Sequence, residues 1–429
     1  MVPSSSPTGP VRNTPYQVVL PFYIYATLSF LVATILLFLS SAAFTQHYFH
    51  PQTLAITHIM ALGWGTMMIL GASHQLVPVL IEGKLHSNTL GYLSFITAGI
   101  GIPLLVYSFY HFFFGWSAQW GAILINIAIL IYICNIAISM SKSKKENIHA
   151  VFVFTAALWL LITIIIGLLL VYNYTYNILS YDSLHYLSFH AHIGIVGWFL
   201  LTVLGIGSRL IPMFLISKYN NVKLLKWIYG LVNFGLISFI IFFLYLRTAS
   251  FYLIPIAAIL IAIILFAYFC RKCYKERIRR KVDDQIKMSL FSIGMMGIPL
   301  IFLIIVIASL LWMTDNPQLV LAYGFCIFFG WITAIIFGMT FKTLPFILWN
   351  KTYHTKAGLG KTPNPRELFS NKMFLYMAVS YLTGFVLFAA GILIKNEILL
   401  KVGAGLLVIA AVLYNGNVFK MAFHQPKKI

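Results

Sequence analysis

The chain has 429 residues, of which 61% are hydrophobic and only 9% charged, and its formal net charge is +20. A soluble protein of this length cannot bury so much apolar surface, whereas a lipid bilayer accepts it. The charge does not indicate a nucleic-acid partner, because the basic residues form short clusters between long apolar runs. The four cysteines are too few for a disulfide framework.

In chain order, a polar N-terminal segment (1–17) precedes twelve apolar segments, each long enough to cross a bilayer as a helix. Helices are expected because an open strand cannot satisfy its backbone hydrogen bonds in lipid. The sequence therefore predicts an all-α integral membrane protein, with a membrane domain over 18–422 and a short tail over 423–429. The expected segments are 18–43, 53–80, 90–111, 119–140, 150–172, 182–215, 225–246, 251–270, 287–313, 317–348, 372–395 and 400–422.

The loops between these segments differ strongly in charge. Of the 29 basic residues, only Arg247, Lys395 and Lys401 fall on one side of the predicted membrane. The positive-inside rule assigns the other, basic side to the cytoplasm. We therefore expect a multi-pass protein of a bacterial inner (plasma) membrane, with both termini cytoplasmic and with the lipid bilayer as partner.

The second, sixth and tenth segments carry one pattern, in which a ring residue is followed at fixed spacing by Gly-Trp, Gly, a polar residue and Pro. The copies are His58, Gly63, Trp64, Gly71, Gln75, Pro78; His192, Gly197, Trp198, Gly205, Arg209, Pro212; and Phe325, Gly330, Trp331, Gly338, Lys342, Pro345. This spacing predicts three pseudo-symmetric four-helix repeats, about 18–140, 150–270 and 287–422. The aligned polar residues would reach the headgroups or contact a ligand.

Histidine is uncommon inside a bilayer and there indicates a functional site. His58 and His192 lie at one depth on equivalent helices, so their rings can face each other across a gap that a planar haem would fill. The alternatives are hydrogen bonds to neighbouring helices or another metal. His190 precedes His192 by two residues, which turns it through roughly 200° on a helix. It is therefore a candidate ligand for a second haem or metal, or a partner of the outer loops.

Further histidines gather on the outer side, at His47, His50, His111 and His185. Together they could form a copper or zinc site, or they could be solvated at the interface. All acidic residues lie at helix ends or in loops, which disfavours a proton pump or a proton-coupled carrier.

The stretch from His190 through His192 to Trp198 resembles the H-x-H-x-G-x-x-G-W helix in subunit I of cbb-type haem–copper oxidases. His58 matches that family's low-spin haem ligand on its second helix, and twelve helices in three arcs is the superfamily's architecture. The resemblance implies that His58 and His192 bind a low-spin haem and that His190 binds a high-spin haem. In the oxidases, however, the H-x-H helix is the tenth and a tandem His-His follows it. In this chain the H-x-H helix is the sixth, and the seventh segment has no tandem His-His. The chain is also similar to NnrS-type haem- and copper-containing membrane proteins linked to nitric oxide.

Taken together, these features predict a haem-binding membrane redox protein of oxidase-subunit-I-like type, with haem b and with copper as a second candidate metal. It would transfer electrons or act on oxygen or nitric oxide, and a c-type cytochrome or a quinol would donate the electrons. As an enzyme it would be an oxidoreductase. The alternative is a transporter or channel with structural histidines, or a protein that delivers haem or metal.

Overall fold

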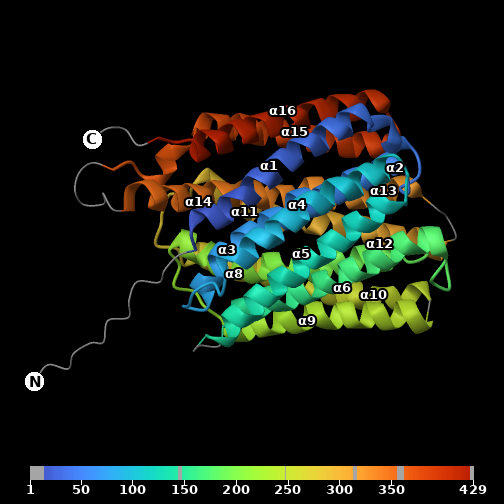
Figure 1. Ribbon diagram of the computed structural model, residues 1–429, viewed down its shortest axis with the longest axis horizontal. Coiled ribbons are helices and arrows are strands. Elements are labelled where there is room, and N and C mark those ends of the chain that lie inside the picture. The colour runs from blue at the N-terminus through green and yellow to red at the C-terminus, as the bar shows by residue number, and fades with distance from the viewer. Residues whose placement is uncertain (1–13, 144–146, 247, 313–315, 355–361, 426–429) are drawn as a thin grey trace, which may run out of the picture.

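The computed structural model describes residues 14–143, 147–246, 248–312, 316–354 and 362–425. Its long helices lie side by side in one bundle (Figure 1). In chain order the helical elements are α1 (Tyr16–Leu39), η1 (Ser41–Thr45), α2 (Pro51–His58), η2 (Ile59–Thr66), α3 (Met67–Leu80), α4 (Asn88–Tyr110), α5 (Trp116–Ser141), α6 (Ile148–Tyr176), α7 (Leu187–His192), η3 (Ile193–Leu200), α8 (Leu201–Leu215), α9 (Val222–Ile241), η4 (Phe242–Leu246), η5 (Ala249–Tyr252), α10 (Leu253–Lys275), α11 (Asp284–Met295), α12 (Gly297–Leu311), α13 (Pro317–Phe325), η6 (Cys326–Ile332), α14 (Thr333–Tyr353), η8 (Pro365–Leu368), α15 (Asn371–Ile394) and α16 (Glu397–Ala422).

Several of these elements join end to end, so that the described residues contain twelve helices long and apolar enough to cross a membrane. The expected all-α class and the expected number of spans are confirmed. The bounds agree to within a few residues, with two instructive differences. The first span ends at Leu39, where a separate turn, η1, takes over, and the tenth continues to Tyr353.

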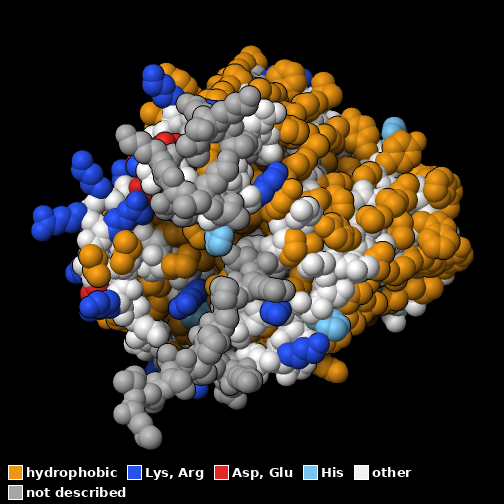
Figure 2. All heavy atoms as spheres, turned by 60° about the vertical axis from the view of Figure 1, so that its left-hand side comes forward, with side chains coloured by type: hydrophobic (Ala, Val, Ile, Leu, Met, Phe, Trp, Pro, Cys, Tyr) orange, Lys and Arg blue, Asp and Glu red, His pale blue; other side chains and the backbone are white. Residues whose placement is uncertain are grey.

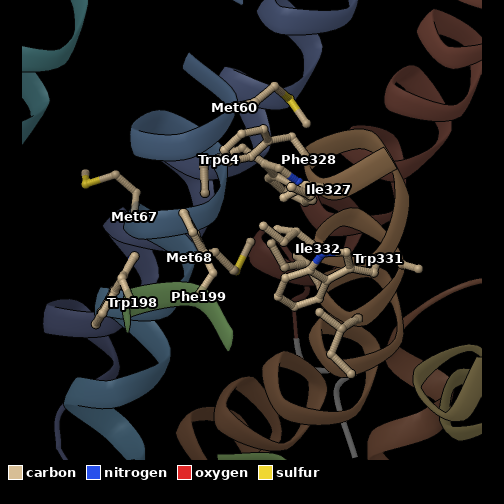
Figure 3. Packing of buried hydrophobic residues seen from close by; sticks show 14 of the residues in the cluster. Met60, Trp64, Met67, Met68, Trp198, Phe199, Ile327, Phe328, Trp331 and Ile332 are labelled. Carbon is tan, nitrogen blue, oxygen red and sulfur yellow. The ribbon is translucent and has the colours of Figure 1, made fainter. Parts of the chain in front are cut away.

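Three π-helical segments occupy the middle of the bundle: η2, η3 and η6. Each begins directly after the ring residue of the sequence pattern. Their side chains meet in the core, where Trp64 and Phe328 lie close to each other (Figure 3) and the rings of Phe199 and Phe328 have centroids 5.9 Å apart. Trp198 Nε1 donates to Thr66 Oγ1 at 2.9 Å and Trp64 Nε1 donates to Thr333 Oγ1 at 3.1 Å. The helix of His58 is therefore bonded to both of the other central helices.

Glycines bring neighbouring outer helices into backbone contact. A Cβ added at Gly121 of α5 would lie 2.8 Å from the backbone nitrogen of Leu105 on α4. A Cβ added at Gly403 of α16 would lie 2.6 Å from the backbone nitrogen of Phe388 on α15. Small residues at such crossings allow the close packing on which helix association in lipid depends.

The basic residues gather at one end of the bundle, and hydrophobic side chains cover much of the face beside it (Figure 2). At this end Asp283, which is mostly buried, pairs with Lys342, with Arg279 at 3.2 Å and with Arg366 at 3.5 Å. Lys342 therefore bonds a carboxylate rather than reaching freely towards headgroups. Other basic residues on which the predicted orientation depends lie outside the described residues, namely Arg12, Lys144, Lys145, Arg247, Lys356, Lys361, Lys427 and Lys428.

Candidate functional site

Two histidines from different helices face each other near one end of the bundle. The rings of His58, the last residue of α2, and His190, on α7, have centroids 6.3 Å apart and planes only 16° from parallel. His58 Nδ1 donates to the carbonyl oxygen of Leu54 at 2.8 Å, and His190 Nδ1 donates to that of Thr163 at 3.0 Å. A carbonyl can only accept, so each Nδ1 carries the hydrogen and each neutral ring keeps a lone pair on Nε2. Both rings are therefore prepared to bind a metal through Nε2.

Both histidines line a cavity of about 460 Å³, whose wall consists mostly of apolar side chains. Its wall includes His58 and His190 and also Asn126, His192 and Tyr323. This volume falls within the range of about 300–1,000 Å³ that is usual for cofactor and ligand sites. Gly167 of α6 makes room for the ring of His190, because a Cβ at position 167 would lie 3.0 Å from Cε1 of His190.

The spacing of the two rings fits an iron with two axial imidazoles. A metal–imidazole nitrogen bond is about 2 Å long and the ring centroid lies about 1 Å beyond that nitrogen, so two opposite ligands place their centroids about 6 Å apart. The measured 6.3 Å agrees with this value. Two nearly parallel imidazole rings, each oriented by a backbone carbonyl, thus line one apolar cavity.

His192 lines the same cavity as His58 and His190, next to Tyr323. Its ring lies 5.8 Å from that of Tyr323, and its Nδ1 donates to the carbonyl oxygen of Ser188 at 2.7 Å. We expected His58 to face His192, whereas the structure brings His58 to face His190. Side chains two residues apart on a helix point to nearly opposite sides. Only one of His190 and His192 can therefore face α2. Which one does so depends on the order of the central helices around the bundle, and the motif alone does not reveal that order.

The third copy of the pattern carries no histidine at this depth, and aromatic rings fill its surroundings. Phe325 stacks against Phe329, Phe385 and Phe388, with centroids 4.6–5.6 Å apart. Gly167 and Thr163, which position His190, were not singled out from the sequence, because neither belongs to the repeated pattern. Tyr323 could be identified from the sequence, because in the third copy of the pattern it occupies the position that His190 has in the second copy.

Three of the four outer histidines, His47, His111 and His185, contact aromatic rings. His47 lies 4.0 Å from the ring of Tyr48. His111 lies 4.6 Å from that of Tyr107, and His185 lies 4.4 Å from that of Tyr181.

At the start of α2, burial lowers the pKa of His50, and its Nδ1 has no hydrogen-bond partner. Within the described ranges, His, Cys, Asp and Glu form no group of three or more that could hold a metal ion. The geometry therefore gives no support to the copper or zinc site expected at His47, His50, His111 and His185.

Comparisons with known proteins give no match: neither a family model nor a curated protein matches this chain. Inference about function therefore starts from the geometry of the two facing histidines.

Proposed function

We propose that this chain is a haem-binding integral membrane protein that transfers electrons, with a haem b held between His58 and His190. The observation that carries the proposal is the pair of facing imidazoles with centroids 6.3 Å apart, set in a cavity of about 460 Å³. A haem with two nitrogen ligands alternates between ferric and ferrous iron and so carries one electron.

The surrounding residues have definite tasks in this proposal. The carbonyl oxygens of Leu54 and Thr163 fix the tautomer and the orientation of the two rings and make each Nε2 a better donor. The apolar wall keeps water from the iron, which tunes its reduction potential. Because His58 and His190 would occupy both axial positions, electron transfer is favoured over oxygen or nitric oxide chemistry, which needs an open position on the iron.

We also propose that the three repeats surround one axis. The π-helical segments follow the ring residue in all three copies of the pattern. In the first repeat the hydroxyls of Ser73 and Tyr132 are bonded at 2.7 Å, and in the third those of Thr340 and Tyr414 are bonded at 3.0 Å. In the second repeat the matching site has Gly207, where a Cβ would lie 3.2 Å from the ring of Phe266. The hydroxyl pairs of the first and third repeats support this arrangement.

The proposed setting is a bacterial inner membrane, with the basic end of the bundle and both termini in the cytoplasm. The haem site would then lie towards the outer surface, since His58 and His190 are close to the opposite ends of their spans from the basic loops. That position suits electron delivery by a c-type cytochrome outside the membrane or by a quinol within it.

Substitution of single histidines tests the assignment. Protein purified from haem-replete bacterial cells should give a pyridine haemochrome of haem b and a reduced-minus-oxidised spectrum of a low-spin haem. We expect His58→Ala and His190→Ala to abolish this spectrum, because each removes one axial ligand, and His192→Ala to preserve it, because that ring faces Tyr323. The reduced wild-type protein should not bind carbon monoxide.

Each contrary result has a definite meaning. Loss of the low-spin spectrum in His192→Ala but not in His190→Ala would restore the pair expected from the sequence. A colourless wild-type protein would overturn the haem assignment and favour a transporter or channel with structural histidines. Binding of carbon monoxide by the wild type would replace electron transfer with gas chemistry.

A further inference from the structure

A second cavity, of about 320 Å³, adjoins the first. It lies between the central helices and α9, α10 and α12, and its wall is apolar apart from a few groups. His192 and Tyr323 line both cavities and so form part of the wall between them. The haem proposal makes no use of this second space or of the Nε2 atom of His192.

The polar chemistry of the second cavity centres on His192. Its Nδ1 donates to the carbonyl oxygen of Ser188 at 2.7 Å, so the neutral ring has a lone pair and no hydrogen on Nε2. His192 lines the second cavity, so a ligand there gains a hydrogen bond from this acceptor only if it brings a donor hydrogen. A ligand that offers only carbonyl oxygens would leave the acceptor unpaired.

Aromatic side chains form much of the remaining wall. The ring of Phe239 lies 5.2 Å from that of His192, and Tyr252, Tyr323 and Trp331 also line the cavity. Such walls favour a flat aromatic ligand, which can stack or make edge contacts with them. The outer faces of α9, α10 and α12 expose large apolar side chains, including Phe234, Ile261 and Ile301. One layer of helices, α9, α10 and α12, therefore lies between the cavity and the apolar outer surface.

We infer that the second cavity binds a lipid-soluble hydroquinone ring, with a ring hydroxyl donating to Nε2 of His192. The acceptor on His192 selects the hydroxyl of the reduced ring, and the aromatic wall holds the ring itself. The inference concerns binding alone and does not require a haem in the first cavity, so the two proposals can fail independently.

The test compares two probes of nearly equal shape, menadiol and its dimethyl ether. The ether has lost both hydroxyl hydrogens and cannot be oxidised to the quinone without losing its methyl groups. Full-length protein in phosphatidylcholine nanodiscs is kept anaerobic with excess dithionite, so that any haem stays reduced. Each probe is partitioned between protein-containing and empty nanodiscs, which subtracts its solubility in lipid. We expect the diol to saturate one site per chain and to bind at least about fivefold more tightly than the ether.

Substitutions then locate the site. His192→Phe should abolish the preference for the diol, and His192→Gln should restore part of it, because the amide oxygen is again an acceptor. His86→Phe is the matched control and should bind as the wild type does, since His86 lines neither cavity. Equal binding of diol and ether by the wild type would overturn the inference without any variant. Full preference retained in His192→Phe would overturn it as well.

Discussion

At the scale of single residues, Gly167 controls whether His190 can keep its place opposite His58. A Cβ at this position would lie 3.0 Å from Cε1 of His190, so any larger side chain must displace the ring. Because the two imidazoles must stay about 6 Å apart to share an iron, we expect Gly167→Leu to lower haem content per protein about tenfold or more. Pyridine haemochrome analysis of the purified variant measures this.

Gly230→Leu is the matched control, because a Cβ there would meet nothing within 4 Å. It should retain the haem content of the wild type. If Gly167→Leu also binds a full complement of haem with an unchanged low-spin spectrum, then His190 is not held where an axial ligand must be.

The same histidines show what a motif can and cannot predict. The sequence could indicate that His58, His190 and His192 matter, because ring nitrogens are rare inside a bilayer and recur here at matched depth. It could also predict that His190 and His192 point to different sides, because helix geometry fixes their angle. It could not tell which of the two faces His58. That depends on how three separate helices are arranged around the bundle, which only long-range packing decides.

At the scale of elements, the central helices are joined by buried indole–hydroxyl bonds. Trp198 is 1% exposed and its Nε1 donates to Thr66 Oγ1. Thr66→Val keeps the side-chain shape but removes the acceptor, so we expect it to lower the free energy of unfolding by about 0.5–2 kcal/mol. Unfolding by a denaturing detergent in mixed micelles, followed by circular dichroism, measures the loss.

A double-mutant cycle with Trp198→Phe isolates this bond. In that background Thr66→Val should cost clearly less, because the donor has already gone. Thr97→Val serves as control, since Thr97 bonds only backbone carbonyls of its own helix and its hydrogen bond to Leu93 is exposed. Equal costs for Thr66→Val in both backgrounds would show that the indole–hydroxyl bond contributes nothing to stability.

The helices themselves were predictable for a plain reason. Whether a segment is apolar and long enough to cross a bilayer can be read from that segment alone. The prediction of a helix is correct even for the spans that contain Pro21 and Pro103. The π-helical segments were not predictable in this way. Each inserts an extra residue into a turn, and the pattern of glycines and tryptophans does not distinguish that insertion from an ordinary helix.

At the scale of the whole molecule, the two larger cavities share His192 and Tyr323 in their walls, and a smaller cavity of about 80 Å³ lies between the three central helices. The two cavities adjoin the helices that carry His58, His190 and His192. Between the first and third central helices the space is packed by aromatic rings, among them Phe30 and Trp64, whose centroids are 4.7 Å apart. In the proposed arrangement, three repeats of related sequence serve two different ends, ligand sites and a rigid core. Composition predicted the membrane fold. The positions of the cavities and of the aromatic core could not be predicted from composition, because they depend on how the helices pack.

The whole molecule also has a predicted direction across the membrane. Lys218 and Lys395 are both exposed and lie in loops at opposite ends of the bundle, after α8 and α15. In a Cys134→Ser background, which removes the one exposed cysteine among the described residues, each lysine can be replaced by cysteine. The positive-inside rule places Lys218 in the cytoplasm and Lys395 outside. We expect a membrane-impermeant maleimide to label Lys395→Cys in intact cells, and Lys218→Cys only after the cells are permeabilised. The reverse pattern would move the facing histidines to the cytoplasmic side, and an electron donor would then have to reach them from there.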